Sequence, residues 1–270
     1  MKISCFLLFV FFAIQTNAQD YLTPVDKILF KGTYNLWYQP DTTRPGKYQR
    51  EKVLLQVGEN ISKSLSLNLF LRDSIIMHVE PSVIWSDMRI FPPVNFYFQV
   101  MKNHPQGKIT TVDNVFTDVY TYTEAFDLFD WVLTGEKDSI SGYECQKATT
   151  TFAGRDWIAW FSPEIPVSDG PYKFHGLPGL IIRIYDTNHH YNFDLESFRP
   201  ENAENMILLP TRTMTRTTKK VFLEAQKRFL RNAAGAILAG NEAMAEHPES
   251  LQRIERAVSM FNNPIELTAD

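Results

Sequence analysis

The sequence has little cysteine, no excess of basic charge and no apolar run long enough to cross a membrane. It holds 2 cysteines among 270 residues, and its 27 basic residues face 31 acidic ones, a net charge of −4. Because no basic block is present, we expect no nucleic acid partner. No apolar run approaches the roughly 20 residues that a spanning helix requires, so we expect no transmembrane segment.

Residues 1–18 are typical of a secretory signal peptide. Lys2 precedes an apolar stretch of about 10 residues, and a short polar segment then leads to the small residue Ala18. We therefore expect an exported protein of the periplasm or cell envelope, or one that is secreted. Removing this segment leaves Cys145 without a disulfide partner in the chain. Stability must then come from a hydrophobic core, and residues 19–270 are long enough to form one as a single domain.

Aromatic residues at alternating positions predict strands. The chain has 20 Phe, 11 Tyr and 5 Trp, and in residues 94–100 apolar side chains alternate with polar ones, as in a half-buried strand. Short polar turns separate these segments, which indicates antiparallel neighbours. Similar patterns predict strands at about 27–38, 51–57, 61–71, 117–122, 130–137, 143–152, 156–162, 180–187 and 190–198.

After Pro210 the pattern becomes helical. Apolar residues recur every fourth position from Val221 to Ile237, whereas basic residues cluster elsewhere, and Pro248 begins a shorter helix. We therefore predict a mainly β (α+β) fold. Residues 24–200 form a curved antiparallel meander sheet or partly open barrel, and the amphipathic helices of residues 217–261 pack on its open or concave side.

The chain resembles the GLPGLI family of secreted proteins of Bacteroidota. Residues 176–181 spell GLPGLI, and the segments 140–166 and 170–174 fit the family pattern around this string. Residues 54–66 and 263–267 resemble two further family segments. The resemblance implies a secreted protein, but it implies no activity, cofactor or catalytic residue.

The GLPGLI string itself predicts a structural turn. The Leu177–Leu180 segment fits a type II turn, in which Pro178 fixes φ at the second position and Gly179 supplies positive φ at the third. Gly176 would then allow close approach of a neighbouring backbone. A phosphate cradle is a poor fit because no Lys-Ser/Thr pair follows the glycines and a strand follows instead of a helix.

Three residues are candidates for ligand binding. If a groove exists, Arg155 would be its polar anchor and Trp160 its aromatic wall. The alternative for Arg155 is a pair with a carboxylate across a hairpin. His175 directly precedes the turn, where it is either a hydrogen-bonded support or a group that contacts ligand.

The histidines and Cys145 carry a second hypothesis. On one continuous strand Asp186, His190 and Asp194 would share a face that a metal could use, although Asp-Thr-Asn at 186–188 favours a solvated loop. Cys145 alternates with its neighbours on a strand and is expected to be buried. We predict neither a metal nor a cofactor, and the local motifs of hydrolases are missing.

These observations favour a non-catalytic binding or accessory protein of the cell envelope. It would hold an apolar or peptide ligand, or an envelope protein, in a cleft between sheet and helix. Two alternatives stay open. One is a metal- or thiol-dependent envelope enzyme centred on His175, His189, His190 or Cys145, and the other is a structural or interaction module of an envelope complex.

Overall fold

The computed structural model describes residues 22–202, 204–211, 213–239, 252, 255 and 258–269. The expected signal peptide and most of the expected short helix after Pro248 lie outside the described residues. The strands are β1 Leu22–Tyr38, β2 Gln49–Gly58, β3 Ser62–Ser66, β4 Gln99–Lys102, β5 Lys108–Val115, β6 Asp118–Ala125, β7 Val132–Ile140, β8 Tyr143–Phe152, β9 Arg155–Ser162, β10 Leu180–Asp186, β11 Tyr191–Pro200, β12 Met206–Pro210 and β13 Thr215–Arg216. The helices are α1 Leu67–His78, α2 Pro81–Ser86, a 3-10 turn at Met88–Ile90, and α3 Lys219–Ala239.

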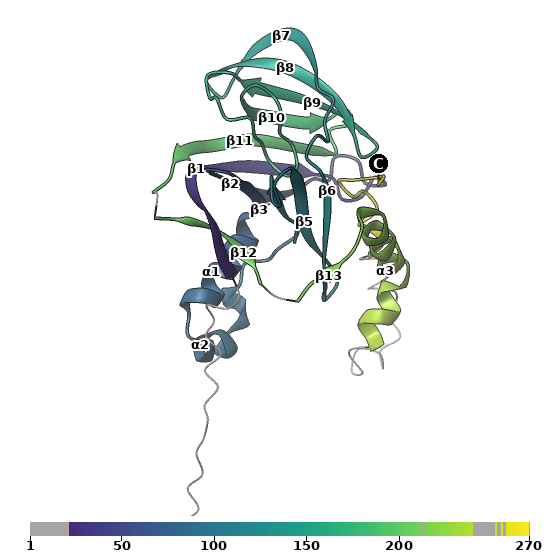
Figure 1. Cartoon of the computed structure of the whole chain (residues 1–270). Coiled ribbons are helices and arrows are strands. Elements are labelled where there is room, and N and C mark those ends of the chain that lie inside the picture. The colour runs from purple at the N-terminus through teal and green to yellow at the C-terminus, as the bar shows by residue number, and fades with distance from the viewer. Residues whose placement is uncertain are drawn as a thin grey trace, which may run out of the picture.

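All strands of the described residues belong to one open, strongly curved sheet (Figure 1). Its order is β13-β6-β5-β4-β3-β2-β1-β11-β10-β9-β8-β7, and β12 pairs with β1. Two meanders, β1 to β6 and β7 to β11, are joined where β1 pairs with β11. The described pairs are antiparallel except for β13 with β6. The predicted mainly β fold with an antiparallel meander is therefore confirmed.

The long strands form because their side chains alternate between two environments. In β1, Tyr34, Leu36 and Tyr38 are at most 3% exposed, while Trp37 is 38% exposed. Since alternate side chains of a strand point to opposite faces, one face of the sheet carries most of the core. We call this the inner face. The core is continuous across both meanders, from Val53 in β2 to Ala159 in β9.

Two predicted strands are wrong in part. The strand expected at 61–71 ends at Ser66, whose Oγ accepts a hydrogen bond from the Leu69 amide at 3.3 Å and so begins α1. In 94–100 the strand starts only at residue 99. The Phe96 and Phe98 rings lie 5.7 Å apart, edge to face, in the core. Their alternation reflects aromatic packing without strand pairing.

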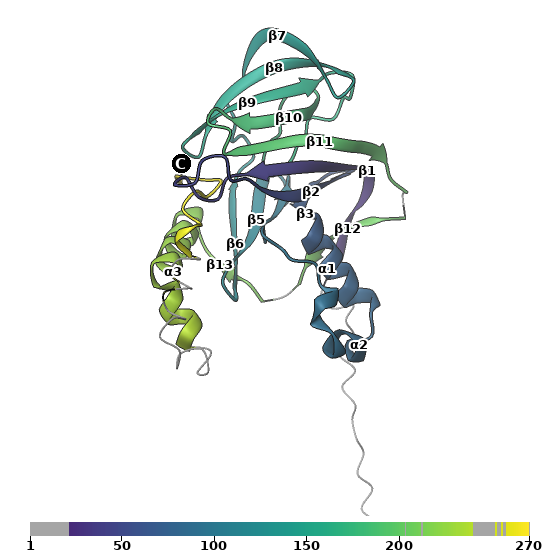
Figure 2. The same ribbon diagram turned by 180° about the vertical axis from the view of Figure 1, so that it is seen from behind.

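Helix α3 begins close to its predicted start, because Thr218 Oγ1 accepts a hydrogen bond from the Val221 amide at 3.3 Å. Ala225 and Ala233 of the predicted stripe are buried, but Val221 is 50% exposed and Phe222, at 3%, takes its place. Figures 1 and 2 show α3 beside β6, whereas α1 and α2 lie at the other end of the molecule. In the described part of the chain, no helix is long and apolar enough to span a membrane.

Candidate ligand-binding cavity

The loop between β9 and β10, residues 163–179, carries most of the GLPGLI string and fills one half of the inner face. Residues 169–175 are buried without interruption. At their centre the Phe174 ring is fully buried, 4.6 Å from the Trp157 ring and 5.4 Å from the Phe129 ring. This loop is therefore part of the core of the β7 to β11 half.

The turn at the end of this loop differs from the predicted type II turn. The Gly179 amide donates to the Leu177 carbonyl at 2.8 Å, an i to i+2 bond that makes a γ-turn centred on Pro178. A Cβ on Gly179 would lie 2.2 Å from the Ser162 carbonyl oxygen. Gly176 has a φ of +93° with ordinary space around it. Gly179 thus has the positive φ expected of it, +156°, and also the close backbone approach that was expected at Gly176.

A buried lysine of the other meander binds residues 169 and 170 of the loop. Lys102 of β4 is 2% exposed, and its Nζ pairs with the Asp169 carboxylate. The same ammonium donates to the Gly170 carbonyl at 2.7 Å. Burial lowers the pKa of Lys102, against the opposing effect of Asp169. The bonds tie β4 of one meander to the loop of the other.

Four charged side chains, three buried and one partly buried, join the loop to α3, β6 and the C-terminal segment. Glu266 lies 2.6 Å from the Lys173 ammonium and 2.9 Å from the Lys219 ammonium. Glu124 pairs with the same two lysines, at 3.0 Å from Lys219. Burial alone would raise the pKa of Glu266, but the two ammonium groups outweigh it and lower the pKa. We call these four residues the charge network.

Arg155, the predicted polar anchor, is 4% exposed and binds the chain's own C-terminal segment. Its guanidinium donates to Asp186 Oδ2 at 3.1 Å and to Asn263 Oδ1 at 2.6 Å. It also donates to the backbone oxygens of Pro264 and Ile265, at 2.6 and 3.0 Å. The carboxylate partner expected across a hairpin is Asp186. Arg155 therefore holds the C-terminal segment against the sheet and does not line the cavity described below.

Three segments that the family resemblance singles out meet at this point. The Leu267 amide donates to the Ala153 carbonyl at 2.8 Å, next to the Arg155 turn. Tyr172 of the loop donates its hydroxyl hydrogen to Glu266 Oε1 at 2.6 Å. Residues 153–155, 170–174 and 263–267 thus form one packed unit.

The other two predicted ligand residues are apart from Arg155. Trp160 is partly buried, and the Lys147 ammonium lies 6.0 Å from its ring centre. His175 is 5% exposed, and its Nδ1 and Nε2 each lie 2.8 Å from a backbone oxygen, of Lys173 and Phe126. Burial and the nearby Lys102 lower the pKa of His175. Its position is that of a buried support for the loop.

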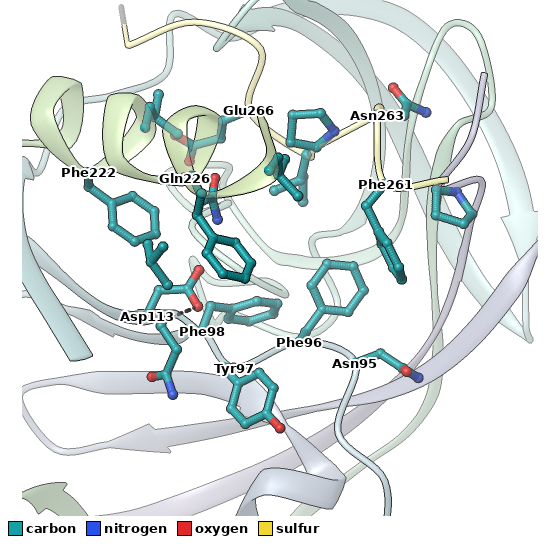
Figure 3. A pocket seen from close by; sticks show the side chains of 18 of the residues that line it. Asn95, Phe96, Tyr97, Phe98, Asp113, Phe222, Gln226, Phe261, Asn263 and Glu266 are labelled. Carbon is teal, nitrogen blue, oxygen red and sulfur yellow. Dashed lines mark hydrogen bonds between the residues drawn. The ribbon is translucent and has the colours of Figure 1, made fainter. Parts of the chain in front are cut away.

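A cavity of about 280 Å³ lies between α3, the C-terminal segment and the inner face (Figure 3). Aromatic residues are the most frequent type in its wall, and Asn95, Asn114, Gln226 and Asn263 add amide groups. The described residues that line it are Tyr38, Pro40, Asn95, Phe96, Tyr97, Phe98, Asp113, Asn114, Val115, Phe116, Tyr122, Tyr172, Tyr191, Phe222, Leu223, Gln226, Phe229, Leu230, Phe261, Asn263, Pro264, Ile265 and Glu266. The cavity lies between sheet and helix, the place where the binding hypothesis puts a ligand.

Asp113 of β5 contributes a carboxyl group to the cavity wall, and the sequence analysis did not identify it as a site residue. The Asn114 amide donates to Asp113 Oδ1 at 2.7 Å. Burial raises the pKa of Asp113 to about 7, against a lowering by Lys173 and together with a further rise from Glu266. No local signal distinguishes this Asp, because β5 itself is absent from the predicted strands.

The residues of the metal and thiol hypothesis do not assemble into a site. Asp194 pairs with Arg183, and His189 is exposed at the tip of the turn before β11. Searched over the described residues, the structure has no group of three or more His, Cys, Asp or Glu that could hold a metal ion. Cys145 is 1% exposed, and burial raises its pKa to about 11. Such a thiol is a poor nucleophile at neutral pH.

Comparisons with known proteins address the fold more than the function. Residues 153–183 match the model of a family described as "Protein of unknown function (Porph_ging)", and this range contains the GLPGLI string. No curated protein matches the chain.

Two solved structures of PNGF-II, in the C2 and P21 space groups, share the fold with TM-scores of 0.51 at 12% identity. They align with 74% and 73% of this chain, but with 32% and 33% of their own. The chain therefore spans about a third of the length of PNGF-II, and the likeness shows the fold alone.

Proposed function

We propose that this chain is an exported, non-catalytic binding or accessory protein of the cell envelope, and a member of the GLPGLI family. It holds an apolar or peptide ligand in the cavity between the sheet and α3. The observation that carries the proposal is the aromatic cavity under α3. The sequence supports export, through residues 1–18, and family membership, through the segments around residues 176–181.

The construction of the cavity supports binding of a small ligand. Ligand pockets are mostly apolar, with a few polar groups that orient the ligand, and a volume of about 300 to 1,000 Å³ suits a drug-sized molecule. At about 280 Å³ this cavity lies just below that range, which suits a ligand smaller than a typical drug molecule. Its roof is α3, which the charge network secures through Lys219 near the start of the helix.

The test is mass spectrometry of protein purified natively from the envelope fraction, with a variant that fills the cavity. Gln226→Trp places a large ring in the cavity, and Lys227→Trp adds the same ring at an exposed neighbouring position. We expect a bound small molecule in the natural protein and in K227W, and its loss from Q226W. Protein that is consistently empty and binds no apolar probe would overturn the proposal.

A second candidate function is an interaction module of an envelope complex. The observation that favours it is an exposed apolar group at the other end of the molecule from α3. Val83, Trp85 and Met88 are 49%, 79% and 55% exposed, and exposed apolar patches often mark contact surfaces. Cross-linking in intact cells tests this candidate. A partner captured by the natural protein and lost from Trp85→Ser would support it, and the same capture by both would contradict it.

A further inference from the structure

The charged side chains that line the cavity are all acidic. Among the described residues that line it there is no Lys, Arg or His, whereas Asp113 and Glu266 contribute two carboxylates. Glu266 is already neutralised, because it binds both ammonium groups of the charge network and accepts the Tyr172 hydroxyl. Among the described residues, Asp113 accepts a hydrogen bond from the Asn114 amide alone. Asp113 is therefore the carboxylate with capacity for a ligand.

The surroundings of Asp113 also favour positive charge. Figure 3 shows its carboxyl group directed toward the space that Phe98, Phe222 and Gln226 border. The faces of aromatic rings attract cations and repel anions. An ammonium group in this space would meet a carboxylate and ring faces together, whereas a carboxylate ligand would meet repulsion from both.

Building on the proposed function, we propose that the ligand is a small apolar amine and that Asp113 binds its ammonium group. The aromatic wall then holds the apolar body. The cavity volume of about 280 Å³ excludes a peptide of several residues but accommodates a short alkyl or aryl chain. An alcohol of the same chain binds through the apolar wall alone, and the matching fatty acid binds most weakly.

The charge state of Asp113 gives the proposal a pH dependence. Burial raises its pKa to about 7; Lys173 opposes this rise, and Glu266 adds to it. Tyr122 also faces this group of charges. An ammonium ligand requires the ionised carboxylate, so binding releases a proton at neutral pH. Affinity for the amine should therefore be about tenfold higher at pH 8 than at pH 6, while affinity for the alcohol stays constant.

Calorimetric titration of the full exported chain with octylammonium, octanol and octanoate tests the proposal. Asp113→Asn keeps the acceptor for the Asn114 amide and removes the charge. Asp118→Asn makes the same change on the same hairpin at an exposed position and is the control. At pH 8 we expect octylammonium to bind at least about tenfold more tightly than octanoate to the natural protein and to D118N. In D113N this preference is lost, and octanol binding is unchanged.

Each contrary outcome has a distinct meaning. If octanol binds but octylammonium binds no better, or if D113N retains the preference, the assignment of Asp113 is overturned while the ligand cavity stands. If none of the three probes binds, both the assignment and the proposed function fail. Unchanged octanol binding by D113N also shows that the variant is folded.

Discussion

The two halves of the sheet cover their inner faces in different ways. The β7 to β11 half is covered by its own loop, residues 163–179, whose Phe174 is packed without exposure. In the β1 to β6 half, α3 and the C-terminal segment lie over β5 and β6, and a cavity of about 280 Å³ remains between them and the sheet. A loop between adjacent strands can place many side chains into the core of those strands. A helix from far along the chain contacts the sheet along one apolar stripe only.

The contacts that hold the two covers also differ. The loop is secured by aromatic packing, by Lys102 and by its own Lys173, which belongs to the charge network. The cover of the other half is secured by the charge network and by Arg155, which bind residues 263–266 and the start of α3. Apolar packing of the loop fills the space above its strands. The ion pairs fix the position of α3 and residues 263–266 but do not fill the space beneath them. The hollow half is thus the part of the molecule suited to binding.

The largest loss of stability should come from removing a buried ring from the β7 to β11 half. Phe174→Ala removes a fully buried ring and should lower the free energy of unfolding by about 3 to 5 kcal/mol. Phe229→Ala, in α3, enlarges a cavity that already exists and should cost about 1 kcal/mol. Urea unfolding at pH 7 measures both variants. Equal costs would contradict the distinction between a filled and a hollow half.

The next largest effect should come from the charge network. Glu266→Gln leaves two buried ammonium groups with one carboxylate and should cost about 3 kcal/mol. Because the folded pKa of Glu266 is lowered, its contribution is present above its unfolded pKa and is lost as the pH falls through its folded pKa. The natural protein should therefore lose more stability toward low pH than E266Q.

The matched control is Glu136→Gln. The carboxylate of Glu136 is 58% exposed and pairs with Lys147, so its loss should cost under about 0.5 kcal/mol. Unfolding curves at several acid pH values separate the two variants. An E266Q protein as stable as E136Q would show that the cover over the hollow half does not depend on the charge network.

A smaller effect should separate the two glycines of the GLPGLI string. Gly179→Ala places a Cβ against the backbone of Ser162 and should cost about 1 to 3 kcal/mol or more. Gly176→Ala meets only ordinary contacts and should cost about 1 kcal/mol for its left-handed backbone. Thermal unfolding of both variants is the measurement. If Gly176→Ala cost more stability than Gly179→Ala, the result would favour the type II turn expected from the sequence.

A last effect concerns Asp113 and appears only as a slope of stability with pH. Its raised pKa means that the folded state keeps a proton that the unfolded chain releases. Stability of the natural protein should fall as the pH rises from about 4 to about 7 and then level off. In D113N this component of the slope is absent, whereas D118N keeps it. Urea unfolding at pH 5 and pH 8 gives the comparison, and identical slopes in D113N and D118N would refute it.

Much of the fold was predictable because the relevant signals are local. Strands such as β8, β9 and β11, and helix α3, lie close to their predicted bounds, since alternation and helical periodicity belong to a single segment. The errors arose where tertiary contacts override that pattern. Phe96 alternates like a strand residue but packs edge to face on Tyr38 without strand pairing. Strand β5 went unpredicted, and with it Asp113.

The sequence by itself determined the mainly β class, the amphipathic helix and the need for glycine at residues 176 and 179. Only the tertiary structure decided what these parts do. It turned Arg155 inward onto the C-terminal segment, assigned the close backbone approach to Gly179, and placed Asp113 in the wall of a cavity. Periodicity is a property of neighbours along the chain, whereas the partner of a buried charge is chosen by packing between segments that the chain brings together only when it folds.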